Sequence, residues 1–148
     1  MAEFIQAVTP IEVPFGQNLP LIGSNKCGCG CRCIEHMEGT GIVTLKGGRT
    51  YDVNFGGNIA VPEGGTAAAI AVALAINGEA LQGSRAIVTP AAVEQYFNVN
   101  ATASIEVPCC CCYTLAVENV NAGVGGEIVD QQTISVADGK LTVTRKAD

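Results

Sequence analysis

The sequence predicts an all-β fold, namely a sandwich, jelly roll or small barrel of short antiparallel strands. Three observations lead to this fold class. The 148 residues include 18 glycines and no tryptophan. Valine, isoleucine and threonine, which favour strands, are frequent, and in several segments apolar and polar residues alternate with a period of two. About eight strands are expected after residue 40, and no helix is expected there except a short one at residues 91–95.

Residues 96–107 give the clearest strand prediction, because apolar and polar side chains alternate there without a break. Pro108 then interrupts the expected ladder. Gly56-Gly57 is expected to bulge or bend the strand that precedes it, and Asp138-Gly139 to form a turn between two strands. The longer expected strands are residues 42–45, 51–55, 69–76, 96–107, 113–117, 128–136 and 141–145.

One of these segments, residues 69–76, would have two dry faces. Large aliphatic side chains occupy one face of the expected strand and alanine the other, and Asn77-Gly78 then supplies a hairpin turn. Alanine is also the strongest helix former, so an alanine-rich helix is the alternative. The alanine face suits close packing against a second subunit. The alanines predicted at this subunit contact are Ala69, Ala71, Ala73 and Ala75.

The chain is expected to form one domain with an accessory segment, because it is too short for two ordinary domains and a linker. Residues 1–40 contain Pro10, Pro14 and Pro20 among short apolar pieces, followed by a cysteine cluster. They predict an extended N-terminal arm with one or two short strands. The regular strand pattern begins after it, so the all-β domain is assigned to residues 41–148.

Composition indicates a protein that associates with copies of itself. Charged residues make up 15% of the chain and the mean hydropathy is +0.32. A free monomer usually keeps large apolar patches off its surface, so part of this exterior is expected in a subunit interface. The net charge of −6 and the absence of a basic run argue against nucleic-acid binding.

No membrane or export segment is predicted. The first residues, Met1 to Ile5, have no cationic stretch ahead of an apolar core, so they do not resemble a secretory signal. The longest apolar run, residues 67–76, is about half as long as a bilayer-spanning helix. The chain is therefore expected to be made in the cytoplasm and to have no membrane partner.

Three segments resemble a known family. The stretches at residues 50–55, 70–78 and 141–145 together resemble the jelly roll of the tumour-necrosis-factor and C1q-like superfamily. Residues 87–93, followed by 96–99 and 105–108, look most like its bacterial branch. That branch includes small surface proteins of phages of Gram-positive gut bacteria and the C-terminal domains of collagen-like spore-surface glycoproteins. The resemblance covers residues 40–148 and leaves the arm unaccounted for.

The resemblance implies an antiparallel jelly-roll sandwich that forms a homotrimer and has a structural or attachment role without catalysis. Because the sequence has no Gly-x-y collagen stalk, the resemblance favours the phage setting. The expected function is a virion structural protein, a capsid decoration or fibre component. It would be made in the bacterial cytoplasm, act on the virion surface, and bind capsid or other virion proteins through its arm. The alternative is a spore or cell-surface adhesin that recognises a glycan or host protein through loops such as residues 78–85.

All eight cysteines fall in two clusters, Cys27, Cys29, Cys31 and Cys33 in the arm, and Cys109, Cys110, Cys111 and Cys112 after the longest strand. On a straight strand the arm sulfurs would lie roughly 6.5 to 7 Å apart, whereas sulfurs on one zinc ion lie about 3.8 Å apart. Curling at Gly28 and Gly30 would still permit a zinc or copper(I) site, which makes a cysteine-rich metal-binding module a third functional alternative.

Two further interpretations of the cysteines remain open. Consecutive cysteines at 109–112 place two sulfurs on each face of an extended chain, so disulfides between the two clusters, within or between subunits, are expected in an oxidising environment. Alternatively, the thiols are small apolar residues of the core. No cofactor is required by any other feature.

Nothing in the sequence predicts an enzyme. His36 is the single histidine and lies three residues after Cys33, which is compatible with a nucleophile and base pair. No recognisable motif supplies an orienting carboxylate, and the hydrolase, phosphate-loop and zinc-protease signatures are absent from the sequence. His36 is therefore interpreted as an ordinary residue.

Overall fold

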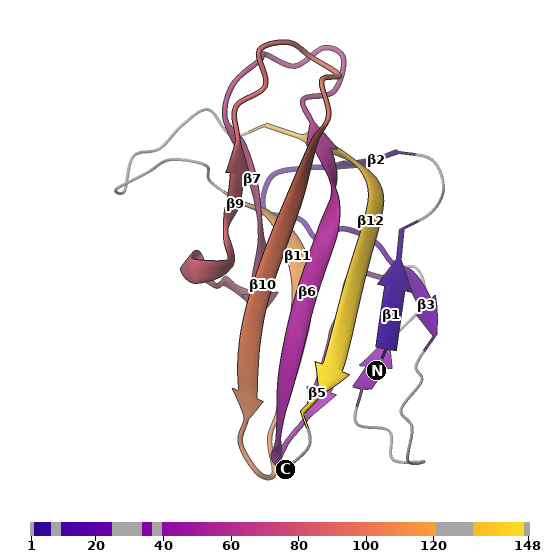
Figure 1. The fold of residues 1–148 in the computed structure, drawn as a ribbon, viewed down its shortest axis with the longest axis vertical. Coiled ribbons are helices and arrows are strands. Elements are labelled where there is room, and N and C mark those ends of the chain that lie inside the picture. Colours follow the sequence, from indigo (N-terminus) through magenta and orange to yellow (C-terminus); the bar gives the residue numbers. More distant parts are fainter. Residues whose placement is uncertain (1, 7–9, 25–33, 37–39, 121–131, 147–148) are drawn as a thin grey trace.

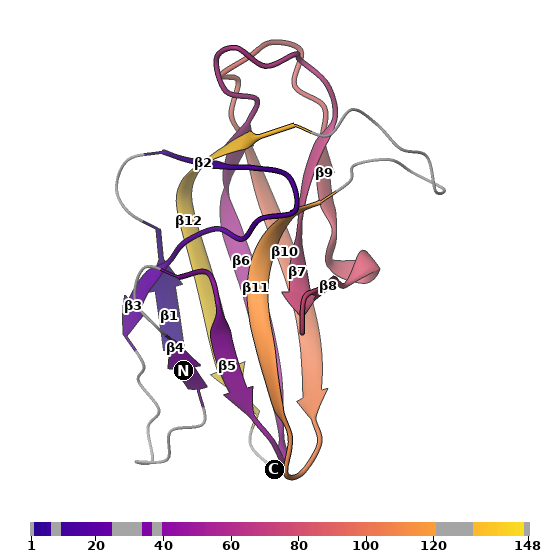
Figure 2. The same ribbon diagram turned by 180° about the vertical axis from the view of Figure 1, so that it is seen from behind.

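Two antiparallel sheets pack face to face in the computed structural model (Figures 1 and 2). The structure describes residues 2–6, 10–24, 34–36, 40–120 and 132–146. The strands run along the long axis of the molecule, and the chain crosses repeatedly between the sheets. The predicted all-β jelly-roll sandwich is confirmed. In the described residues, no helix is long and apolar enough to cross a bilayer.

Sheet A contains the two longest strands side by side. Its order is β10, β6, β12, β1 and β3, and β2 also pairs with β12. Every pairing in it is antiparallel. The bounds are β1 (Ala2–Ile5), β2 (Ile11–Val13), β3 (Ile22–Ser24), β6 (Arg49–Ala60), β10 (Phe97–Val107) and β12 (Ile134–Arg145).

Sheet B has the order β4, β5, β11, β7 and β8, and β9 also pairs with β7. The β7–β8 connection is the tight hairpin expected at Asn77-Gly78, and both residues have a positive φ. A single 3₁₀ turn, η1 (Gln82–Ser84), follows. The bounds are β4 (Ile34–His36), β5 (Val43–Lys46), β7 (Ile70–Ile76), β8 (Glu79–Ala80), β9 (Ala86–Val88) and β11 (Cys112–Val120).

The core lies between the sheets and follows the alternation of the sequence. Along β10 the odd-numbered residues from Val99 onward face sheet B, and the even-numbered ones point outward. Burying a large aliphatic or aromatic side chain contributes about 1.5–3 kcal/mol, so this continuous core is the main source of stability. Its largest fully buried members are Tyr51, Phe4, Phe55, Leu19, Leu21, Ile34, Leu45, Ile59, Leu74, Leu115, Ile134 and Leu141.

The described residues among the first forty, 2–6, 10–24, 34–36 and 40, belong to the sandwich instead of forming the predicted accessory arm. β1, β2 and β3 belong to sheet A, and β4 belongs to sheet B. Phe4, Leu19 and Leu21 are at most 1% exposed and lie in the same core cluster as the later strands. Single apolar residues between prolines gave too weak a periodic signal to show that each one enters the core.

The predicted turn at Asp138-Gly139 is also wrong, because β12 continues through it. The register shifts between Ala137 and Lys140, so the extra residues form a β-bulge. The buried side chain of Gln6 holds this bulge, since its Nε2 donates to the Val136 carbonyl at 2.6 Å and its Oε1 accepts from the Gly139 amide at 2.9 Å. The Asp-Gly pair favours a positive φ, and a β-bulge can accommodate a residue with positive φ as well as a turn can.

Two other expectations are corrected by the pairing of β6 and by backbone angles. The pairing of β6 with β10 is continuous through Gly56-Gly57, and the bulge expected there lies instead on β12, opposite Gly57. Residues 91–95 form turns and bends instead of a helix. Glu94 has a φ of 58°, which is incompatible with a right-handed helix, and the Gln95 side chain accepts a hydrogen bond from the Ala91 amide at 2.9 Å.

Candidate functional site

The alanine face of β7 is covered within one chain. Ala71 and Ala73 are 0% exposed and Ala75 is 2% exposed, while Ala69 is half-buried just before the strand. The chain after β7 turns back along it, and Ser84 Oγ accepts a hydrogen bond from the Leu74 amide at 3.0 Å. The prediction of a trimer interface is therefore wrong for Ala71, Ala73 and Ala75, and for Ala69 it stays a prediction. The pattern showed that both faces are dry, but not that the chain itself covers them.

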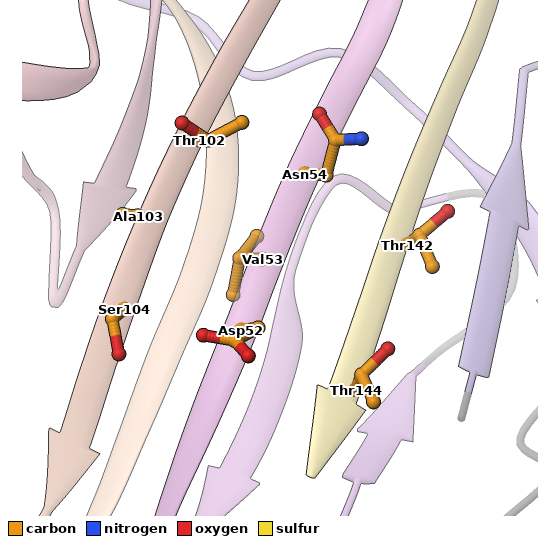
Figure 3. A pocket seen from close by; sticks show the side chains of 8 residues that line it. All are labelled: Asp52, Val53, Asn54, Thr102, Ala103, Ser104, Thr142 and Thr144. Atoms are coloured by element: carbon orange, nitrogen blue, oxygen red, sulfur yellow. The ribbon is translucent and has the colours of Figure 1, made fainter. Parts of the chain in front are cut away.

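An open polar surface is formed by the outer face of sheet A, meaning the face turned away from sheet B. Short polar side chains of β10, β6 and β12 point outward along it and leave a hollow of about 500 Å³ (Figure 3). Asn and Thr side chains line its upper part, and Asp52 lies lower on β6. The lining residues are Asp52, Val53, Asn54, Thr102, Ala103, Ser104, Thr142 and Thr144.

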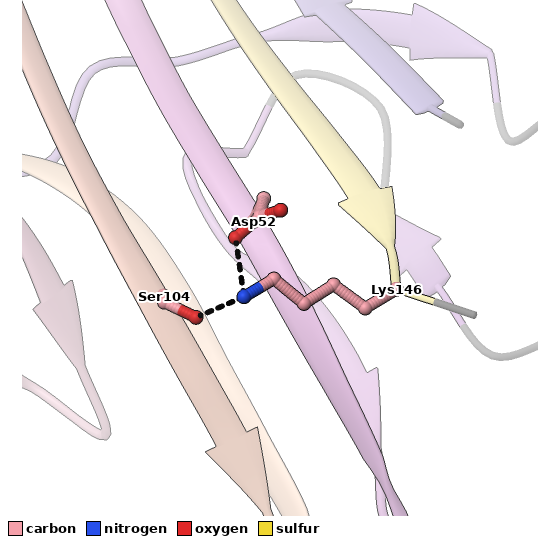
Figure 4. Close-up of polar contacts among 3 residues, drawn as sticks. All are labelled: Asp52, Ser104 and Lys146. Atoms are coloured by element: carbon pink, nitrogen blue, oxygen red, sulfur yellow. Dashed lines mark hydrogen bonds and ion pairs between the residues drawn. The ribbon is translucent and has the colours of Figure 1, made fainter. Parts of the chain in front are cut away.

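The polar groups of this outer face bond mainly to one another. Lys146 Nζ lies 3.4 Å from Asp52 Oδ1 and donates to Ser104 Oγ at 3.2 Å, which spans the lower end of the hollow (Figure 4). The Lys146 and Asp52 side chains are both about half exposed, so their ion pair contributes at most about 1 kcal/mol. Higher on the face, Asn98 Nδ2 donates to Asn58 Oδ1 at 3.3 Å. The residues that line the hollow therefore offer one carboxylate, that of Asp52, together with amides and hydroxyls for hydrogen bonds. No nucleophile paired with a base is found among these lining residues.

Exposed apolar side chains gather at the two opposite edges of sheet A. The β10 edge patch consists of side chains on β10 or close to it in the chain or in contact, which are 37–40% exposed: Phe97 on β10, Val93 and Tyr96 shortly before it, and Ile87 on β9 of sheet B, a strand that contacts β10. The β3 edge patch consists of Ile5 and Ile22, which are 50% and 45% exposed and are direct cross-strand partners. Because β10 and β3 are the first and last strands of the sheet, the patches face in different directions.

These edge patches were not identified from the sequence. The Tyr96 hydroxyl lies 2.8 Å from Ser135 Oγ on β12, a contact between residues far apart in the sequence. Ile5 and Ile22 become neighbours only through the β1–β3 pairing. The low charge content was the one signal that an apolar surface exists, and it does not indicate where on the molecule that surface lies.

The second cysteine cluster forms the turn between β10 and β11, at the end of the sandwich where β12 also ends (Figures 1 and 2). Cys109, Cys110, Cys111 and Cys112 are all exposed free thiols. They are therefore not core residues, and the interpretation as small buried groups is wrong for this cluster. In the described residues, no three His, Cys, Asp or Glu side chains are placed so that they could hold one metal ion.

The first cluster, Cys27, Cys29, Cys31 and Cys33, lies outside the described residues, as does the side chain of His36. Disulfides between the clusters stay a prediction. The described residue nearest in sequence to Cys33 is Ile34, which pairs with Leu45, and Leu45 pairs with Tyr113 beside the second cluster. Strands lie about 4.8 Å apart, so the backbones of Ile34 and Tyr113 are about 10 Å apart.

Solved structures share this fold at low sequence identity. The tumour necrosis factor Eiger from S. frugiperda matches with a TM-score of 0.70 and 12% identity, over 99% of this chain and 92% of that one. The globular domain of zebrafish complement 1qA matches with a TM-score of 0.53 and 11% identity, over 95% and 92% of the two chains. Murine APRIL matches with a TM-score of 0.51 and 12% identity, over 95% of each chain.

No protein-family model matches the chain, and no curated protein matches it. The evidence for kinship is thus structural, and identities of 11–12% show the fold alone. The matches extend over the first forty residues as well, in agreement with their place in both sheets. The chain has the two-sheet jelly-roll fold of the solved tumour-necrosis-factor and C1q domains.

Proposed function

We propose that this protein is a non-catalytic structural module that assembles as a homotrimer on the surface of a virion. The observation that carries the assembly is the pair of different apolar patches at opposite edges of sheet A. Joining the β10 edge patch of one copy to the β3 edge patch of the next is a head-to-tail contact, which closes into a ring when the rotation between copies allows.

The number of copies comes from the family resemblance, which implies three. The outer face of sheet A lies between the two patches, so it would border the contact on each subunit. Its Asn, Thr and Ser side chains suit a hydrated rim, because the rims of protein interfaces are polar and contain bridging water. The low charge of the chain supports the same conclusion, since an isolated surface of this composition is poorly soluble.

Two aspartate variants, one at each edge patch, test the assembly. Wild-type protein should scatter light with about three times the mass of the 15.2 kDa chain. Ile5→Asp and Ile87→Asp should each give monomers, because each places an unpaired charge in a dry contact. Ile42→Asp is the control, since Ile42 is 46% exposed and lies outside both patches. Circular dichroism should show that all three variants remain folded.

Mixing the two patch variants gives a sharper result. Each variant retains one intact patch, so a head-to-tail contact predicts dimers in the mixture and monomers in the separate samples. A symmetric contact, in which each patch meets its own copy, predicts no such rescue. Monomeric wild-type protein at micromolar concentration, or equal dissociation of Ile42→Asp, would refute the proposed assembly.

The virion setting is supported by the sequence resemblance alone. Capsid and portal genes beside the coding sequence would favour it, and sporulation genes would favour a spore-surface protein. Attachment to a particle was expected through residues 1–40, but much of that segment belongs to both sheets. Attachment through the described part of this segment would therefore use exposed residues of the folded domain. The adhesin alternative would use residues 78–85, which include β8 and η1.

A further inference from the structure

The cysteine turn is held in a defined shape by the connection between β5 and β6. The Cys111 amide donates to the Pro108 carbonyl at 3.2 Å, which closes the turn. Gly47 packs so tightly against it that a Cβ there would lie 2.1 Å from the Pro108 oxygen. A Cβ on Gly48 would lie 3.4 Å from Cys109 Sγ. The turn is therefore supported from beneath by glycine, and its four thiols face solvent.

Cys110 occupies a backbone conformation that cysteine rarely adopts. Its φ is 67°, in the left-handed region that favours glycine, asparagine and aspartate. The other positive-φ residues that are not glycine in the described chain are Asn77, Glu94 and Asp138. A non-glycine residue in this region costs about 1 kcal/mol or more, and such outliers concentrate at functional sites. Glycine would be less strained than cysteine at position 110.

Cations surround this turn in a protein whose net charge is −6. Lys46 is the cross-strand partner of Cys112, and both side chains are exposed on the same face of sheet B. Arg49 follows Gly48, and Arg145 and Lys146 end β12 at the same end of the sandwich. Half of the chain's eight Lys and Arg residues therefore lie at this end.

The charges at this end act on a common neighbour. Tyr51 donates its hydroxyl hydrogen bond to the Lys46 carbonyl at 2.7 Å. Burial raises the pKa of Tyr51, Arg49 and Arg145 oppose that rise, and Cys112 adds to it. The cations and the Cys112 thiol thus lie within electrostatic reach of one buried hydroxyl. The described carboxylates nearby are Asp52, which pairs with Lys146, and Glu106.

We propose that the Cys109–Cys112 turn is a thiol–disulfide exchange site that reacts preferentially with anionic disulfides. A cysteine thiolate attacks one sulfur of the incoming disulfide, a protein–partner S–S bond forms, and the partner's S–S bond breaks. The second partner sulfur leaves as a thiolate with the bonding electron pair. A neighbouring thiolate of the turn can attack the mixed disulfide in the same way and release the first partner sulfur. The incoming disulfide is the oxidant in both steps.

The cations at this end of the sandwich are the proposed cause of the preference for anionic disulfides. Clustered charge of one sign raises the encounter rate of oppositely charged molecules by about tenfold or more at low ionic strength. An anionic disulfide, or a disulfide on an acidic protein surface, would therefore meet these thiols faster than a neutral one. The proposal is independent of the trimer, because every group that it uses belongs to one chain.

The test uses two disulfides that report their own reaction by absorbance. Dithiobis(nitrobenzoate) is a dianion and 2,2′-dithiodipyridine is uncharged. The test uses a variant with the substitutions Cys27→Ser, Cys29→Ser, Cys31→Ser and Cys33→Ser, so that the turn supplies every thiol. The rate with dithiobis(nitrobenzoate) is divided by the rate with 2,2′-dithiodipyridine, first in the folded protein and then in urea. Dividing the folded ratio by the urea ratio removes the intrinsic reactivity of the two reagents and gives the normalised ratio.

We expect this normalised ratio to be about 10 at low salt and to approach 1 in 0.5 M salt, where the Debye length is only a few ångströms. Lys46→Gln with Arg49→Gln should lower it several-fold. Arg85→Gln with Lys140→Gln, which removes equal charge elsewhere, should leave it unchanged. A normalised ratio near 1 at low salt, or one that salt does not change, would overturn the proposal even if a double variant failed to fold.

Discussion

Replacing Phe4 with alanine tests whether the N-terminal segment belongs to the core or is a separable arm. Phe4 is 0% exposed, and its strand β1 pairs with β12 through the Phe4–Leu141 register. A buried Phe→Ala substitution costs about 3–5 kcal/mol, because transfer free energy is lost and a cavity remains. For a chain of this length, that loss corresponds to a melting temperature lower by about 6–20 °C.

Urea unfolding followed by circular dichroism measures the effect, at one fixed protomer concentration because association adds to apparent stability. Glu3→Ala is the control, since Glu3 is exposed on the same strand and forms an exposed ion pair with Lys140 worth about 1 kcal/mol or less. If Phe4→Ala loses no more free energy of unfolding than Glu3→Ala, then β1 does not contribute to the core and the placement of this segment is refuted.

Three further predictions concern titration, packing and the thiols. Burial raises the pKa of Glu118 from its ordinary value of 4.5. Ionisation of Glu118 therefore destabilises the fold as the pH rises through the raised pKa. Glu118→Gln should raise the urea midpoint of unfolding at pH 7 but not below about pH 4, where the carboxyl group is protonated. Gly47→Ala should destabilise the protein strongly, because the new Cβ would clash with the Pro108 carbonyl. Gly83→Ala should not, because open space surrounds the position of its Cβ. Equal urea midpoints for the two variants would contradict the packing of the cysteine turn. If disulfides join the two cysteine clusters, air-oxidised protein should lose about 2–4 kcal/mol in reductant and be insensitive to chelator; if thiolates hold a metal, the chelator should act and reductant alone should not.

The strands that are half-buried were the most predictable part of the fold. β10 was expected at residues 96–107 and is observed at Phe97–Val107, because one polar face and one core face impose an unbroken alternation. β7 was also found, at Ile70–Ile76, although its alanine face gave a wrong functional interpretation. The burial of Ala73 at 0% means that Ala73→Glu should unfold the chain, and not merely separate subunits.

Short strands were the least predictable part. β1 to β4 have three or four residues each, too few for a period to be recognised, and they form only because longer strands offer them a partner. The bulge in β12 required the Gln6 side chain, which comes from more than a hundred residues away in the chain. Local sequence at Asp138-Gly139 is compatible with a turn and with a bulge, and a distant contact chooses between them.

The sequence by itself determined the fold class, the strand with the longest unbroken alternation (β10), the tight turn at Asn77-Gly78 and the existence of an apolar surface in a weakly charged chain. These properties depend on local periodicity, local backbone preferences and composition, which the sequence displays directly. The tertiary structure decided which dry faces the chain covers itself, which apolar side chains remain at the edges of sheet A, and which cations surround the cysteine turn. Those properties depend on contacts between residues far apart in the sequence, and the pairing of strands sets them.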